Sequence, residues 1–142
     1  MIALDTNVLV RHIVRDDERQ AEAATRLIES QCTAETPGII VLVVLCELVW
    51  VLDRGYDYGR AAIADVLRRI LSAEDLQVER SEVAWRALGY YEEGQADFAD
   101  YVIGVCGQEE KAQTTYTFDR RTIAGGLFTV VPPLVSRPSP TD

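Results

Sequence analysis

Short apolar runs alternate with longer amphipathic stretches along the whole chain. Apolar runs bounded by turn residues predict strands at residues 2–5, 39–42, 76–79, 114–118 and 127–131. Apolar stripes at helical spacing predict helices at 8–14, from a cap at Asp16, at 44–52 with an end at Gly55, and at 58–72, 81–92 and 97–112. Strands that alternate with helices are typical of an α/β fold with a mostly parallel central sheet covered on both faces.

Single carboxylates interrupt or border several of these apolar runs. They are Asp5, Glu47, Asp97, Asp100 and Asp119, and no Lys or Arg lies within two residues of the first four. An ionised carboxylate that is buried without a partner costs on the order of several kcal/mol. One divalent cation shared among these side chains would compensate all of them, and the pattern therefore indicates a metal site.

The expected topology allows these distant acids to meet. Asp5 and Asp119 each follow a strand, and ligands of open α/β sheets bind beyond the carboxyl ends of the strands. Asp97 and Asp100 share one face of the first turn of a helix, whose positive end favours anions. Hard oxygen ligands suit Mg²⁺ or Mn²⁺, and a bound metal can lower the pKa of a water molecule to near neutrality.

Three of these acids also have a structural interpretation that stays open. Asp5 and Asp97 are good helix N-caps, and Asp119 is a common turn residue. Glu47 is the hardest to explain in this way, because it lies in the middle of an apolar run expected to be buried.

Other candidate residues have weaker patterns. His12, the only histidine, is expected on the surface or at a dimer face, and Trp50 and Trp85 are expected in core or dimer packing. The basic side chains near the acids in sequence are either solvated charges or contacts for RNA phosphates, and they are Arg11, Arg15, Arg120 and Arg121.

Composition limits the class of protein. The chain has 142 residues, and we expect a single domain at 1–135 with a flexible tail at 136–142. Its net charge of −9 means that no global positive field is expected for binding nucleic acid. A local metal would still permit nuclease chemistry. The three cysteines lack metal-binding spacing, and no signal or membrane-spanning segment is apparent, so we expect a cytoplasmic protein.

Four ordered motifs resemble those of PIN-domain ribonucleases, and most closely the VapC-type toxins of bacterial toxin–antitoxin pairs. The motifs occupy residues 4–11 (LDTNVLVR), 46–52 (CELVWVL), 96–103 (ADFADYVI) and 117–120 (TFDR), and the resemblance extends to about Pro133. It implies a three-layer α/β/α fold, dependence on Mg²⁺ or Mn²⁺, and cleavage of single-stranded or looped RNA. It also implies a homodimer and a cognate antitoxin protein that blocks the site.

The resemblance also implies roles for individual residues. Asp5, Glu47 and Asp100 match the three core acids of the family, Asp119 matches a more variable fourth acid, and Asp97 is common in its motif. Thr6 and Thr117 match groups that orient carboxylates or water.

Two alternatives to an RNA-cleaving enzyme stay open. A receiver-like signalling domain also gathers acids around Mg²⁺, but it needs a lysine near its last strand, and the only lysine here is Lys111, on the preceding helix. A metal-free version of the same fold that binds RNA or acts as a scaffold would be indifferent to EDTA.

Overall fold

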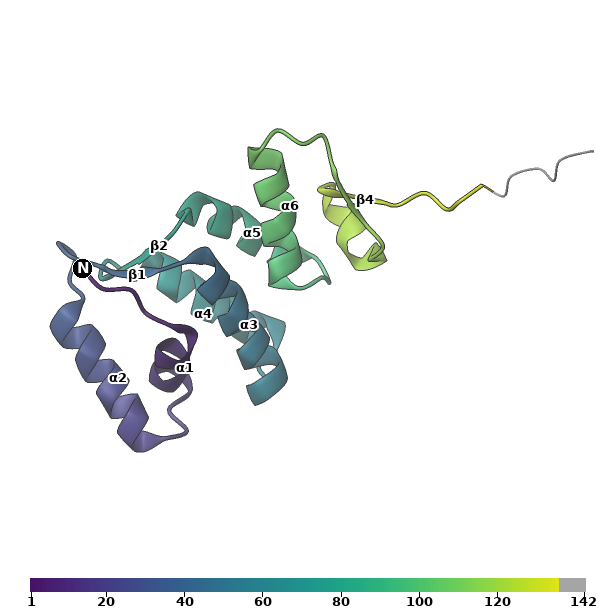
Figure 1. The fold of residues 1–142 in the computed structure, drawn as a ribbon. Coiled ribbons are helices and arrows are strands. Elements are labelled where there is room, and N and C mark those ends of the chain that lie inside the picture. The colour runs from purple at the N-terminus through teal and green to yellow at the C-terminus, as the bar shows by residue number, and fades with distance from the viewer. Residues whose placement is uncertain (136–142) are drawn as a thin grey trace, which may run out of the picture.

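The computed structural model describes residues 1–135, and the expected tail at 136–142 lies outside the described residues. The helices are α1 (Thr6–Val14), α2 (Glu18–Gln31), α3 (Leu42–Tyr56), α4 (Arg60–Ser72), α5 (Ser81–Glu93) and α6 (Phe98–Glu109), with a 3-10 helix, η1 (Arg120–Gly125). The strands are β1 (Gly38–Ile40), β2 (Leu76–Val78), β3 (Thr115–Thr117) and β4 (Phe128–Val130) (Figure 1). The predicted α/β class and alternation of elements are confirmed.

The strands form two separate parallel pairs within the described residues. β1 pairs with β2, and β3 pairs with β4. The predicted first strand is reduced to one parallel bridge between Ala3 and Ile39, in which Leu4 N donates to Ile39 O at 2.9 Å. Parallel pairing was therefore predicted correctly, but the strands do not join into one continuous sheet.

One continuous hydrophobic core links the two ends of the described chain. It includes Leu4 near the N-terminus, Leu45 and Leu48 of α3, Phe98 of α6 and Phe128 of β4, all buried. Every helix from α1 to α6 contributes to this core.

Element boundaries differ from the prediction at α2 and α3. Asp17, one residue after the predicted cap, is the N-cap of α2, and its carboxylate accepts from Gln20 N at 3.0 Å. The α3 helix begins at Leu42 and continues through Gly55 to Tyr56. It ends at Asp57, which adopts the left-handed conformation with a φ of 59°.

The β3–β4 pair is seated closely on α6. A Cβ atom at Gly104 of α6 would lie 2.7 Å from Phe128 Cε2 and 3.0 Å from Leu127 Cβ, so only glycine allows this approach. Leu127 and Phe128 are both buried. The segment that carries Asp119 is therefore fixed to α6, which carries Asp97 and Asp100 at its start.

The three cysteines, Cys32, Cys46 and Cys106, are all free. Burial raises the pKa of Cys46 to about 11, so this thiol stays protonated at neutral pH and is a poor nucleophile. Among the described residues, no helix has the length and apolar character needed to cross a membrane.

Candidate active site

The first group of acids consists of Asp5 and Glu47, and Thr6 contacts both. Asp5 is the N-cap of α1, and its Oδ1 accepts from Thr6 N at 2.8 Å. Thr6 is buried, and its Oγ1 donates to Glu47 Oε1 at 3.2 Å. The expected role of Thr6 in orienting a carboxylate thus has a direct counterpart in a contact that joins residues 41 positions apart. We call Asp5 and Glu47 the first acid group.

Glu47 is exposed, and the prediction that it is buried was wrong. The apolar residues around it cover more than the buried face of α3, because some of them lie on its exposed face. Leu45, Leu48 and Leu52 face the core, whereas Val43 and Trp50 lie on the outer face with 65% and 62% of their surfaces exposed. Helical periodicity places residues 43, 47 and 50 on that same outer face. The interpretation of Glu47 as a metal ligand therefore loses its support from burial and keeps only its motif position.

The second group of acids is built around the start of α6 and the end of β3. Asp97 is the N-cap of α6, and the half-buried Asp100 accepts from Asp97 N through Oδ2 at 3.2 Å. Asp119 is the N-cap of η1, and its backbone N–H donates to Thr117 Oγ1 at 3.0 Å. The helix-cap interpretations of Asp5 and Asp97 are thus confirmed, and Asp119, which was expected in a turn, caps a 3-10 helix. We call Asp97, Asp100 and Asp119 the second acid group.

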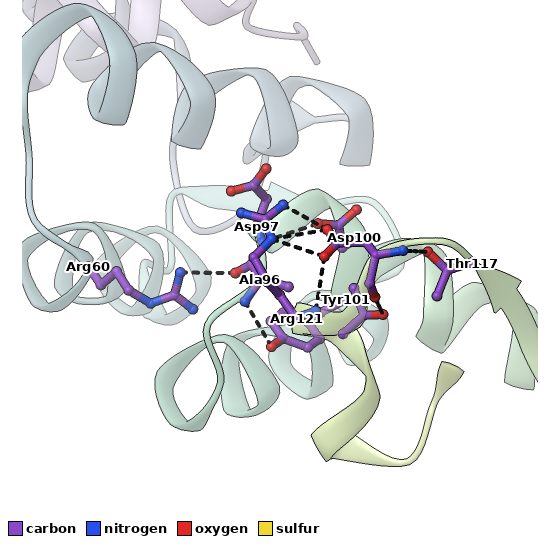
Figure 2. A network of polar contacts seen from close by, with 9 residues as sticks. Arg60, Ala96, Asp97, Asp100, Tyr101, Thr117 and Arg121 are labelled. Carbon is purple, nitrogen blue, oxygen red and sulfur yellow. Dashed lines mark hydrogen bonds and ion pairs between the residues drawn. The ribbon is translucent and has the colours of Figure 1, made fainter. Parts of the chain in front are cut away.

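Arg121 supplies an internal cation to this second group (Figure 2). Its Nη2 donates to Asp119 Oδ2 at 2.7 Å, and its Nε lies 3.0 Å and 3.1 Å from the two carboxylate oxygens. Asp119 also accepts from Arg121 N at 2.9 Å. The side-chain hydrogen bond from Arg121 is the largest cause that lowers the pKa of Asp119.

The charges around Asp100 show which acids lie near one another. Partial burial is the largest cause that raises the pKa of Asp100, and the negative charges of Asp97 and Asp119 raise it further. The hydrogen bond from the Asp97 backbone and the charge of Arg121 lower it. The second acid group is therefore one electrostatic unit that includes Arg121.

The loop before α6 is held by residues that sequence reasoning missed. Arg60 of α4 donates to the carbonyl oxygens of Tyr91 and Ala96, the latter at 2.9 Å, and its guanidinium lies 3.9 Å from the centre of the Tyr91 ring. Ala96 N donates to Tyr101 Oη at 3.2 Å (Figure 2). These contacts fix the position of the first turn of α6, where Asp97 and Asp100 lie. The Arg60 contacts join segments 36 and 31 residues apart, and no local sequence pattern indicates them.

The two acid groups are not brought together in one chain. Within residues 1–135, no set of three or more His, Cys, Asp or Glu side chains is arranged to hold a metal ion. The carboxylate oxygens fit Mg²⁺ or Mn²⁺ in chemical type, but their placement does not fit a shared ion. The acids therefore lie in two groups, because the segment that ends at Asp5 is bonded to β1, whereas Asp119 follows β3 of the other strand pair.

Three of the four arginines proposed as phosphate contacts are engaged within the chain. Arg11 bonds Gln20 and Asp16, Arg15 bonds the Thr25 hydroxyl at 2.9 Å, and Arg121 binds Asp119 as described above. Arg120 is exposed, and among the described residues it makes no side-chain hydrogen bond or ion pair. Of the four arginines, Arg120 is therefore the one whose guanidinium could bind a phosphate without first breaking a side-chain contact among the described residues.

His12 lies on α1 away from the carboxylates. Its Nδ1 is 2.8 Å from Thr25 Oγ1, and the ring is half-buried in a hollow between helices that Ile28 and Ile70 also line. Trp50 and Trp85 are exposed, so the prediction that they pack in the core was wrong, and the alternative of packing against another protein stays open.

Comparison with known proteins identifies the family. The family model described as PIN domain matches residues 2–124. The chain is 28% identical over 132 residues to a VapC ribonuclease of Aquifex aeolicus, which covers 93% of this chain and 97% of that protein. It is also similar to the crystal structure of VapC20 of Mycobacterium tuberculosis, a toxin that cleaves the sarcin–ricin loop, with 26% identity, a TM-score of 0.43 and coverage of 94% of this chain and 100% of that one. Because the family model spans most of its length, this chain belongs to the PIN domain family.

Proposed function

We propose that this protein is a metal-dependent endoribonuclease and the toxin of a toxin–antitoxin pair. The observation that carries the proposal is the PIN domain match over residues 2–124, within which all five acids occupy the expected motif positions. Similarity to a VapC ribonuclease along 93% of the chain supports the activity and the class of substrate, which is RNA.

In this proposal, Asp5, Glu47, Asp100 and Asp119 are the catalytic acids, and Asp97 accompanies them at the metal. Mg²⁺ or Mn²⁺ is the proposed cofactor, because every donor in the set is a hard carboxylate oxygen. Within residues 1–135, a single chain does not assemble these carboxylates around one ion. What the chain itself provides is orientation of Glu47 by Thr6 and a raised pKa at Asp100.

The proposed partner is a basic antitoxin segment. The chain carries a net charge of −9, and both acid groups present exposed carboxylates. Such a surface attracts arginine-bearing segments. The bidentate pair of Arg121 and Asp119 illustrates the contact that an arginine of the antitoxin would make with Asp5, Glu47 or Asp100.

Co-expression with the product of the small adjacent gene tests this partner. We expect the two proteins to co-purify and RNA cleavage to stop. A neighbouring protein that does not bind, or that binds without affecting cleavage, would remove the toxin assignment and leave the nuclease assignment standing. We also propose a cytoplasmic location, in line with the three free cysteines.

A metal-free RNA-binding protein is the second candidate, because no metal-holding cluster exists within residues 1–135. Its signature would be RNA binding that is unchanged by EDTA, without cleavage. The receiver-like alternative has less support, because Lys111 lies in the turn after α6 and not beside an acid group.

Asn substitutions, one in each acid group, test the nuclease assignment. Asp5→Asn and Asp100→Asn should keep the fold and reduce RNA cleavage by at least about a hundredfold, more than the loss of an outer partner of a metal ligand causes. Glu22→Gln is the control, because Glu22 is an exposed acid of α2 paired with Arg26. Near-normal cleavage by either folded Asn variant would refute the assignment.

A further inference from the structure

Each acid group lies beside a strand edge that lacks a neighbour within the described residues. The N-terminal segment is bonded to β1 on one side, and β3 is bonded to β4 on one side. Leu4 N bonds Ile39 and Thr115 N bonds Leu127 O, at 2.9 Å and 3.2 Å. Hydrogen-bonding groups of successive strand residues point to opposite sides, so those of Ala3 and Tyr116 point to the free edges. Unpaired edges of this kind are templates for another strand.

The two free edges are compatible in direction. The N-terminal segment runs parallel to β1 and β2, and β3 runs parallel to β4. Joining the Ala3 edge to the Tyr116 edge gives one five-stranded parallel sheet in the order β2, β1, residues 2–4, β3, β4. The carboxyl ends of the adjacent segments 2–4 and β3 then bring Asp5 next to Asp119.

Apolar side chains are exposed around both edges. On one side, Val43 and Trp50 share the outer face of α3 with Glu47. On the other, Tyr116 and Phe118 leave 63% and 84% of their surfaces exposed at β3, and Ile103 is exposed on α6 one turn after Asp100. Large apolar side chains grouped around polar residues mark interaction surfaces.

The chain cannot join these edges by itself without breaking its core. Figure 1 shows the β1–β2 pair and β4 on opposite sides of α5 and α6. Phe98, Leu127 and Phe128 are buried, and moving β3 to the N-terminal segment would expose them, at roughly 1.5–3 kcal/mol for each side chain. Arg60 also holds the loop before α6 in place. In a second copy, the same edges are available while this core stays intact.

We propose that a second copy of this chain pairs its β3 edge with the N-terminal edge, and that each catalytic site is shared between the two copies. One copy contributes Asp5 and Glu47, and the other contributes Asp97, Asp100 and Asp119. A two-fold axis repeats the contact, so a dimer contains two complete sites. The strand pairing stands by itself, whereas the shared catalytic site rests on the proposed nuclease function.

The strand pairing is tested by Tyr116→Pro with Tyr116→Thr as the matched control. Proline removes the free-edge N–H of β3 and leaves the bonds to β4 intact. Threonine also removes the aromatic ring, but it keeps the N–H. We expect light scattering to report dimers for wild type and Tyr116→Thr, and monomers with an unchanged circular dichroism spectrum for Tyr116→Pro. A monomeric wild type, or a dimeric Tyr116→Pro, would overturn the pairing.

A disulfide test does not depend on how proline is tolerated. Ala3→Cys and Tyr116→Cys are made in separate chains that carry serine at Cys46 and Cys106, and the two proteins are mixed and oxidised. We expect a covalent dimer in the mixture in excess of either protein alone. A chain that carries both substitutions is oxidised for comparison. A disulfide that forms within that monomer, and not between the mixed chains, would show closure within a single copy and overturn the proposal.

Complementation tests the shared site. Asp5→Asn and Asp100→Asn chains are co-expressed with different affinity tags, and only mixed dimers are assayed. One of their two sites then combines two intact acid groups, so about half of wild-type cleavage is expected. Inactive mixed dimers beside an active wild type would refute the shared site. An inactive wild type would refute the nuclease assignment, and the strand pairing would still be decided by the proline and cysteine variants.

Discussion

The two acid groups of this protein differ in how their negative charge is balanced. Asp5 and Glu47 are approached by the backbone and hydroxyl of Thr6, which are neutral donors. Asp97, Asp100 and Asp119 surround Arg121, which forms a bidentate pair with Asp119. Within the described residues, the first acid group is therefore bonded to neutral donors, and the second acid group is paired with the positive charge of Arg121.

This difference gives the groups different dependence on an external cation. Like charges at close range cannot all ionise without cost unless a positive charge is added. Arg121 already supplies one positive charge to the second acid group. If both groups meet, five carboxylates face this one positive charge, and a divalent metal would balance part of the remaining negative charge.

The largest expected effect is stabilisation by a metal that both groups share. Mg²⁺ or Mn²⁺ at a hundred times its Kd should stabilise wild type by about 2.7 kcal/mol, because it binds the folded site and barely the unfolded chain. For a domain of this size, that raises the melting midpoint by on the order of 8 °C. Asp5→Asn and Asp100→Asn should each remove most of the shift, and Glu22→Gln should keep it.

Melting curves in EDTA and in millimolar metal measure this effect. Identical wild-type curves would contradict a shared metal. A response that is lost in Asp100→Asn and retained in Asp5→Asn would show that the second group binds metal independently.

The next largest expected effect is on stability, and it concerns the packing of β4 against α6 at Gly104. Gly104→Ala should destabilise the protein by about 1–3 kcal/mol, because the added Cβ would overlap Phe128 and Leu127. Gly89→Ala in α5 is the matched control, because no atom lies within 4 Å of its new Cβ. Alanine there should be neutral or stabilising. Urea denaturation measures both, and equal midpoints for the two variants would contradict the tight seating of β4 on α6.

A smaller effect concerns the internal cation. Arg121→Ala removes the positive charge that competes with a metal at Asp119, so the metal concentration needed for half-maximal stabilisation should fall by up to about fivefold, the range of an exposed ion pair. Arg120→Ala should leave it unchanged, because Arg120 makes no side-chain ion pair among the described residues. Thermal melting across a metal titration distinguishes the two, and an equal shift in both variants would mean that only net charge matters.

The sequence predicted local features of the site well. Helix caps at Asp5 and Asp97 and a turn at Asp119 follow from residue type and position, and all three are present. The contact between Arg121 and Asp119 spans only two residues, so it is a local feature too, although the sequence pattern indicates either a solvated charge or a phosphate contact for Arg121.

Non-local features were predicted less well. The exposure of Glu47 could not be derived, because the outer face of α3 is itself apolar at Val43 and Trp50, and hydrophobicity alone does not identify the buried side. The division of the strands into two sheets depends on how α6 and β4 pack through Gly104, Leu127 and Phe128, which no strand pattern encodes.

The smallest expected effect lies outside both acid groups, at His12, and serves as a baseline for pH experiments. Burial is the largest cause that lowers the pKa of His12, and the charge of Arg15 lowers it further, against smaller opposing effects of Glu29 and Asp75. The unfolded chain, with an ordinary pKa of about 6.5, takes up a proton that the folded protein resists. The free energy of unfolding should therefore fall as the pH drops from about 7 through this value toward the lowered folded pKa. His12→Gln should flatten this dependence and leave the contribution of the carboxylates, which both proteins share. Urea midpoints between pH 7 and pH 5 measure the difference, and a wild type that gains stability relative to His12→Gln on acidification would contradict the direction of the shift.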